Sequence, residues 1–209
     1  MKRFIIAMAL VVFMTGAVSA EGMMFGMKGG LNLANMTGDD VEDNKMKMAF
    51  GGGVWMNYAF TEAISLQPEL MFMLKGMDYD ITLGTETFEG IGKTTYLDLN
   101  ILGKYSIPME GNFSPNIFAG PYVGMLMSAE ADIPNEAMDD LETQDMKDET
   151  KSMDLGVVFG VGFDYMLEEG CITFDVRYAM GLTTIDDSDS DDDMKNTGIM
   201  FMVGYGFNF

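Results

Sequence analysis

Hydrophobic and polar residues alternate one position at a time along much of the chain. Between residues 153 and 165 every odd position is bulky and apolar, whereas the even positions are mostly Gly or Asp. The segment from 199 to 209 repeats the pattern. Because side chains on a strand point to opposite faces in turn, this period of two predicts β-strands. Eight segments carry it, near residues 23–34, 48–60, 64–76, 94–106, 115–127, 153–166, 171–183 and 197–209.

The gaps between these segments alternate in length. Four are long, at 36–47, 77–92, 128–151 and 184–195, and the three between them are short, at 61–63, 107–114 and 167–170. In an up-and-down arrangement, all the long connections then fall at one end. Bacterial outer-membrane barrels have this asymmetry, with short periplasmic turns and long extracellular loops. We therefore predict an all-β fold, an eight-stranded antiparallel up-and-down transmembrane β-barrel, with both termini periplasmic.

The composition of the two strand faces bears on the alternative of a soluble, lipocalin-like barrel. A soluble barrel would place a polar face in water, yet the less apolar face here is crowded with glycine, as at Gly156, Gly160 and Gly162. Small residues suit the narrow interior of an eight-stranded barrel. Aromatic residues on the bulky face gather near the short-turn end, as expected of a membrane interface. They are Phe25, Tyr58, Phe60, Tyr105, Phe163, Tyr165, Phe174, Phe207 and Phe209.

The N-terminus has the three parts of a secretory signal peptide. Lys2 and Arg3 precede an apolar run from residue 4 to 14, and small residues end the segment at Ala20. This order of charged, apolar and small-residue regions predicts cleavage after Ala20. We therefore expect a signal peptide over residues 1–20 and an outer-membrane β-barrel domain over residues 21–209.

Composition excludes several functional classes. The chain has no histidine, which removes Ser-His-Asp hydrolysis and His-ligated zinc or haem. Its formal net charge of -21 argues against nucleic acid, whose binding requires Lys and Arg at the phosphates. Cys171 is the only cysteine, and the 24 methionines form no cluster with it in the sequence, so we interpret them as flexible filler. We expect no enzymatic activity and no cofactor.

The excess acid lies in the long gaps. These four segments hold 23 of the 33 Asp and Glu residues, with two dense runs at 130–149 and 186–193. Our interpretation is solvated extracellular loops that like-charge repulsion keeps apart. Low-affinity Ca²⁺ or Mg²⁺ binding by clustered carboxylates is the alternative, although no EF-hand spacing supports it.

A second set of charges falls on the glycine-rich face of the predicted strands. Because unpaired charges in a water-poor lumen are costly, we expect them to form a hydrogen-bonded network that fills the barrel. A filled lumen argues against an open pore. The network is predicted to contain Lys28, Glu69, Asp98, Lys104, Asp164, Asp175 and Arg177, with Lys75 and Asp154 on the same face.

Five short motifs occur at strand positions in a recognisable order. They are Gly26–Asn35 (GMKGGLNLAN), Ser65–Leu70 (SLQPEL), Tyr96–Leu99 (YLDL), Gly120–Tyr122 (GPY) and Arg177–Leu182 (RYAMGL). In these motifs the chain resembles the small outer-membrane β-barrel family that includes the PorT-like proteins of Bacteroidetes-type bacteria. The resemblance implies a single-domain outer-membrane barrel. PorT itself is associated with protein secretion, which makes an accessory secretion role one hypothesis for this chain.

These observations favour a non-enzymatic outer-membrane barrel with a structural or interaction role. A barrel that transports small solutes or hydrophobic ligands is the other hypothesis. The expected partners are outer-membrane lipid and, during biogenesis, the barrel-assembly machinery, for which the terminal aromatic Phe209 is a predicted recognition signal. We expect a monomer.

Overall fold

The computed structural model describes residues 22–38, 45–83, 86–135, 140–187 and 193–208. Within them the chain is almost entirely β-structure, with one short 3₁₀ turn, η1 (Lys147–Glu149). No helix in these ranges is long and apolar enough to cross a membrane. The strands are β1 (Met23–Thr37), β2 (Lys47–Ala59), β3 (Ile64–Leu83), β4 (Glu86–Ser106), β5 (Phe113–Asn135), β6 (Asp140–Asp145), β7 (Met153–Met166), β8 (Gly170–Gly181) and β9 (Lys195–Asn208).

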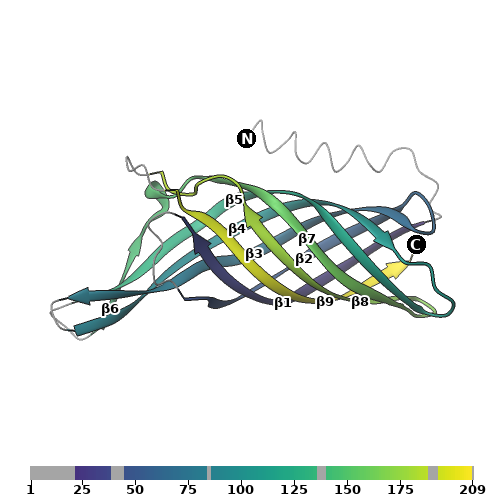
Figure 1. Ribbon diagram of the computed structural model, residues 1–209, viewed down its shortest axis with the longest axis horizontal. Helices are drawn as coiled ribbons and strands as arrows, with labels where there is room; N and C mark the ends of the chain where they lie inside the picture. The colour runs from purple at the N-terminus through teal and green to yellow at the C-terminus, as the bar shows by residue number, and fades with distance from the viewer. Residues whose placement is uncertain (1–21, 39–44, 84–85, 136–139, 188–192, 209) are drawn as a thin grey trace.

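Eight of these described strands close into an antiparallel barrel (Figure 1). Each of the eight pairs with the next barrel strand in the chain, so that β5 pairs with β7 and β6 lies outside the ring. β1 pairs with β9 to complete the ring. The predicted eight-stranded up-and-down barrel is therefore confirmed. We call the end with the β2–β3, β4–β5 and β7–β8 connections the turn end and the opposite end the loop end.

The outer surface of the barrel is apolar. Met27, Val54, Val161 and Val203 are each more than half exposed, and they alternate along their strands with buried or partly buried inward-facing residues. A surface of this kind is stable against hydrocarbon. The closed ring lets the backbone N–H and C=O groups of every barrel strand form hydrogen bonds and leaves no unpaired strand edge. Aromatic rings contact one another on this surface near the turn end, in the pairs Tyr58–Phe60, Phe113–Phe163, Phe163–Phe174 and Tyr205–Phe207.

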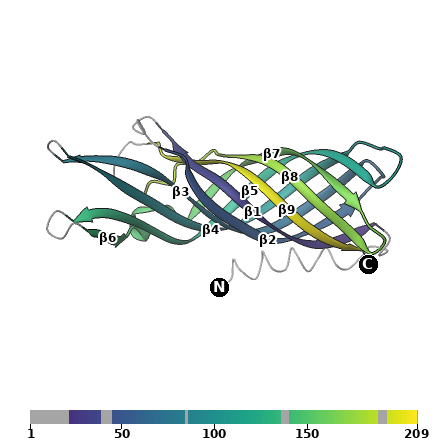
Figure 2. The same cartoon turned by 90° about the horizontal axis from the view of Figure 1, so that it is seen from below.

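Two of the predicted long connections are wrong. In the segment 77–92, β3 and β4 continue to pair as far as Leu83↔Glu86. In the segment 128–151, β5 runs on to Asn135 and pairs with the additional strand β6. The resulting arms extend past the rest of the barrel at the loop end (Figure 2). The strand signal was present in the sequence, because residues 77–83 (MDYDITL) continue the alternation, and the prediction ended this strand too early.

Backbone hydrogen bonds also join two connections at the loop end. The amide of Lys151 donates to the carbonyl of Ile185 over 2.7 Å, and the amide of Asp187 donates to the carbonyl of Glu149 over 2.9 Å. Ile185 is buried beneath them. The segment from Glu149 to Lys151 is thus hydrogen-bonded to residues 185–187 at the start of the β8–β9 connection.

The two predicted processing and assembly residues lie outside the described ranges. Ala20 precedes Gly22, where the description begins, and Phe209 follows its last residue. The signal peptide and the C-terminal assembly signal therefore stay predictions.

Candidate functional site: the charged barrel interior

Charged and apolar side chains form layers along the barrel axis. From the turn end, the inward-facing residues of β3 run Ser65, Gln67, Glu69, Met71, Met73 and Lys75, and all six are buried. The other strands contribute residues to the same layers, because the antiparallel register places Asp98 of β4 opposite Met71 and Lys104 opposite Ser65. Every predicted network residue, from Lys28 to Arg177, lies in this interior and is buried.

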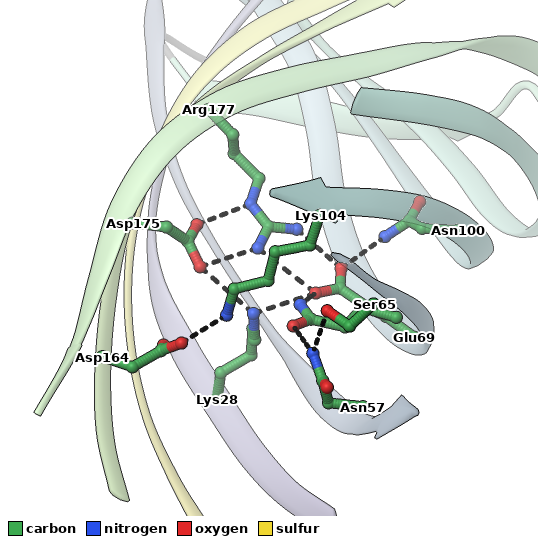
Figure 3. Close-up of polar contacts among 10 residues, drawn as sticks. Lys28, Asn57, Ser65, Glu69, Asn100, Lys104, Asp164, Asp175 and Arg177 are labelled. Carbon is green, nitrogen blue, oxygen red and sulfur yellow. Dashed lines mark hydrogen bonds and ion pairs between the residues drawn. The ribbon is translucent and has the colours of Figure 1, made fainter. Parts of the chain in front are cut away.

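The four-charge cluster consists of Lys28, Glu69, Asp175 and Arg177 (Figure 3). Arg177 binds Asp175 with two nitrogens, Nε at 2.6 Å and NH2 at 2.8 Å, and its NH1 lies 2.6 Å from Oε2 of Glu69. Lys28 Nζ completes the ring, 2.9 Å from Glu69 and 3.1 Å from Asp175. Two positive and two negative charges cancel, so the cluster is neutral without a bound ion.

Two amides complete the hydrogen bonding of Glu69. Gln67 donates to Oε1 over 2.8 Å and Asn100 donates to Oε2 over 3.0 Å. The carboxylate therefore accepts from a guanidinium, an ammonium and two amides. Sequence reasoning missed Gln67 and Asn100 because it searched for charges, although both sit on the same strand face as the residues it named.

Lys104 and Asp164 form a separate pair nearer the turn end. Lys104 Nζ lies 2.6 Å from Oδ2 of Asp164 (Figure 3). The pair lines a cavity of about 290 Å³, which we call the turn-end cavity. Trp55, Asn57 and residues of the β2–β3 turn also line it. The indole N–H of Trp55 is buried and has no hydrogen-bond partner among the described residues.

The three-charge cluster lies toward the loop end and consists of Lys75, Asp98 and Asp154. Lys75 Nζ is 2.9 Å from Asp98 and 3.0 Å from Asp154. Tyr122 donates its hydroxyl proton to Asp154, and the amide of Asn196 donates to the same carboxylate over 3.0 Å. With two carboxylates and one ammonium, this cluster has a formal excess of one negative charge.

An apolar layer separates the two clusters. Its members are Met71, Met73, Leu102, Phe118, Tyr122, Val158, Ala179, Met200 and Met202, which come from six strands. Aromatic rings in this layer also meet the cations on either side. The guanidinium of Arg177 lies 5.1 Å from the centre of the Phe118 ring, and Lys75 Nζ lies 4.6 Å from that of Tyr122. These contacts are within the range of cation–π attraction.

Above the barrel, a further ion pair ties β4 to β5. Lys93 contacts Asp132, and Thr143 of β6 donates to the same carboxylate over 2.8 Å. These residues lie beyond Met125, where the pairing of β5 with β7 ends. The hydrogen bond from Lys93, with that from Thr143, holds the pKa of the Asp132 carboxyl below its usual value.

The interior carboxylates are occupied by partners, and among the described residues no group of three or more His, Cys, Asp or Glu side chains is placed to hold a metal ion. Several acids of the two dense runs, such as Glu136 and Asp191, lie outside the described residues. Divalent binding at the loops therefore stays a hypothesis.

Comparison with known families gives one match. Residues 19–187 match the family described as "Outer membrane protein beta-barrel domain". No curated protein matches the sequence. The match is at the level of the barrel domain, so the finer resemblance to PorT-like proteins stays a prediction.

Several solved structures resemble this chain at low sequence identity. Neisserial surface protein A superposes with a TM-score of 0.56 at 9% identity, over 90% of this chain and 98% of that one. The attachment invasion locus protein Ail of Yersinia pestis, solved with the heparin analogue sucrose octasulfate, gives 0.45 at 14% identity, over 88% and 99%. Outer Membrane Protein W of E. coli gives 0.45 at 14% identity, over 90% and 99%. The similarity to Neisserial surface protein A supports the barrel fold alone.

Replacement of Arg177 by Met tests the four-charge cluster. The change keeps a long side chain but leaves Glu69 and Asp175 with a single cation, so we expect a loss of about 3–5 kcal/mol of stability. The measurement is the urea unfolding midpoint of the refolded barrel. Lys195→Met is the matched control, because the Lys195–Asp193 pair is accessible to solvent and such a pair is worth about 0–1 kcal/mol. Equal midpoints for the two variants would contradict a stabilising interior network.

The Asp132 contacts predict an acid-sensitive loop-end arm. Because the pKa of Asp132 is lowered in the folded state, its carboxylate stabilises the β4–β5–β6 pairing at pH values above the unfolded pKa of about 3.9. This stabilisation is lost as the pH falls through the lower folded pKa. The carboxyl ¹³C shift of Asp132, followed by NMR against pH, should titrate below that value. Lys93→Met should return the midpoint toward it; a normal midpoint in the native chain would refute the interaction.

Proposed function

Because this chain belongs to the outer membrane β-barrel domain family, we propose that it is a filled, non-enzymatic outer-membrane barrel with a structural or interaction role. The family and the barrel fold imply an outer-membrane location. What the barrel does there is the proposal.

One observation carries it: the interior is occupied across its width in successive layers. The four-charge cluster, the apolar layer and the three-charge cluster follow one another along β3, and each is built of buried side chains. Ions cross a barrel only through a water-filled lumen. An eight-stranded barrel is so narrow that side chains fill its interior and leave no room for such a water channel. This filling supports an anchor for the loop end and disfavours a pore.

The proposal includes an orientation, with the turn end in the periplasm and the loop end outside the cell. Three short turns at one end and long, acid-rich segments at the other support it, since outer-membrane barrels keep their short turns periplasmic. The charge then concentrates on the exposed end, where it favours cationic partners and repels anionic ones.

The absence of histidine supports a non-enzymatic role, as does the lack of a free nucleophile–base pair among the named interior residues. Transport of small solutes or hydrophobic ligands is the competing hypothesis. An accessory role in protein secretion rests on the PorT-like resemblance alone.

Planar-bilayer recording separates the filled barrel from a pore. Purified protein in a bilayer should give no stable single-channel current. Tyr122→Gly combined with Met73→Gly, which removes two large side chains of the apolar layer, is the informative comparison. It should raise the frequency of ion-conducting events if these side chains block the lumen. A steady current from the native protein would favour transport.

Cysteine labelling on intact cells tests the orientation. In a Cys171→Ser background, Glu149→Cys places a thiol at the loop end and Glu168→Cys places one in the β7–β8 turn, both at exposed positions. A membrane-impermeant maleimide should label the first and spare the second until the outer membrane is permeabilised. The reverse result would overturn the orientation.

A further inference from the structure

Two sulfur atoms from distant parts of the sequence are in contact at the turn end, and a third sulfur-bearing residue is paired beside them on the next strand. Cys171 begins the inward-facing positions of β8, and its Sγ lies 3.0 Å from Sδ of Met24 on β1. Met166 of β7 is the residue paired directly with Cys171 across the β7–β8 ladder. Partners at such positions have Cβ atoms about 4.5–5.5 Å apart, so the Met166 thioether can reach the same point.

Small residues make this meeting possible. β9 separates β1 from β8 in the ring, and its residue opposite Cys171 is Gly206. A Cβ built on Gly206 would lie 2.8 Å from Sδ of Met24. Only glycine therefore leaves the space across β9 that brings the β1 thioether to the β8 thiol.

The sulfur group borders the turn-end cavity. Met24 and Met166 both line it, together with Glu62, Lys104 and Asp164. The last two neutralise each other at 2.6 Å, so Glu62 leaves the lining with a net charge of about -1. Cys171 itself is buried, with its Sγ against the Met24 thioether. A small cation can thus approach from solvent and reach the thiol by way of the two methionines, whereas an anion is disfavoured.

Thiol and thioether sulfurs select soft metal ions. Cys and Met ligands favour Cu(I), whereas Zn²⁺ takes thiolate, imidazole and carboxylate ligands and makes little use of thioethers. We propose that Cys171, Met24 and Met166 form a binding site for one soft monovalent cation, Cu(I) or its analogue Ag(I), at the turn end. On binding, the thiol proton leaves to solvent and a sulfur–metal bond replaces the S–H bond, with no change in oxidation state.

Titration of the full-length barrel in detergent micelles tests the site. Reduced, metal-free protein competes with a coloured Cu(I) chelator, and Ag(I) serves as the air-stable second probe. We expect one equivalent of either ion. Cys171→Ser should weaken binding at least about 100-fold, and Met24→Leu and Met166→Leu about tenfold each, the order of effect of removing a supporting group at a metal site. Zn²⁺ should not compete.

Controls keep this test decisive. Leu nearly matches Met in volume, so the methionine variants should fold. Comparison of boiled and unboiled samples on a denaturing gel checks the fold. Met109→Leu, at an exposed turn position, should bind as the native chain does. If Met24→Leu and Met166→Leu bind with native affinity, the cysteine acts alone and the proposed site is wrong. Binding that survives Cys171→Ser overturns it as well.

Discussion

A charged group inside an eight-stranded barrel has hydrocarbon around the wall and no bulk water beside it, so its solvation must come from other side chains. Lys28 and Arg177 obtain it from Glu69 and Asp175, because each cation lies within hydrogen-bonding distance of both carboxylates. Removal of any one of the four leaves a buried charge uncompensated, which costs far more than the loss of a surface pair. The strands that supply these residues, β1, β3 and β8, are thus held in one register by the same interaction.

Layering follows from this constraint. The apolar layer keeps the three-charge cluster, with its formal excess of one negative charge, apart from the neutral four-charge cluster. The methionines and aromatic rings between them provide a polarisable spacer, and the rings of Phe118 and Tyr122 face the cations on either side. Part of the unusual methionine content thus has a position in the fold, since unbranched side chains fill an irregular space between ionic groups.

Alternation along the chain was sufficient to predict the closed barrel, because lipid outside and a crowded lumen inside impose opposite demands on successive residues. The prediction ended β3 and β5 too early although residues 77–83 and 128–133 continue the alternation, whereas the start of β4 (ETFEGIG) is irregular. The interior acids and bases were identifiable from strand register, but their grouping was not. That Glu69 meets Arg177, 108 positions away, depends on barrel closure. The sulfur contact between Met24 and Cys171 was equally invisible, because it crosses β9 at a glycine.

One strand changes its partner along its length. As far as Met125, β5 is bonded to β4 and β7, and from Glu130 its partner on the second side is β6 instead. The ring therefore closes without any help from β6 or the residues that follow Met125. Substitutions, insertions or deletions in the arm need not disturb the membrane-embedded wall. Selection then acts against such changes only through the function of the arm itself. The loop end of this protein is in that sense free to evolve faster than the body that carries it.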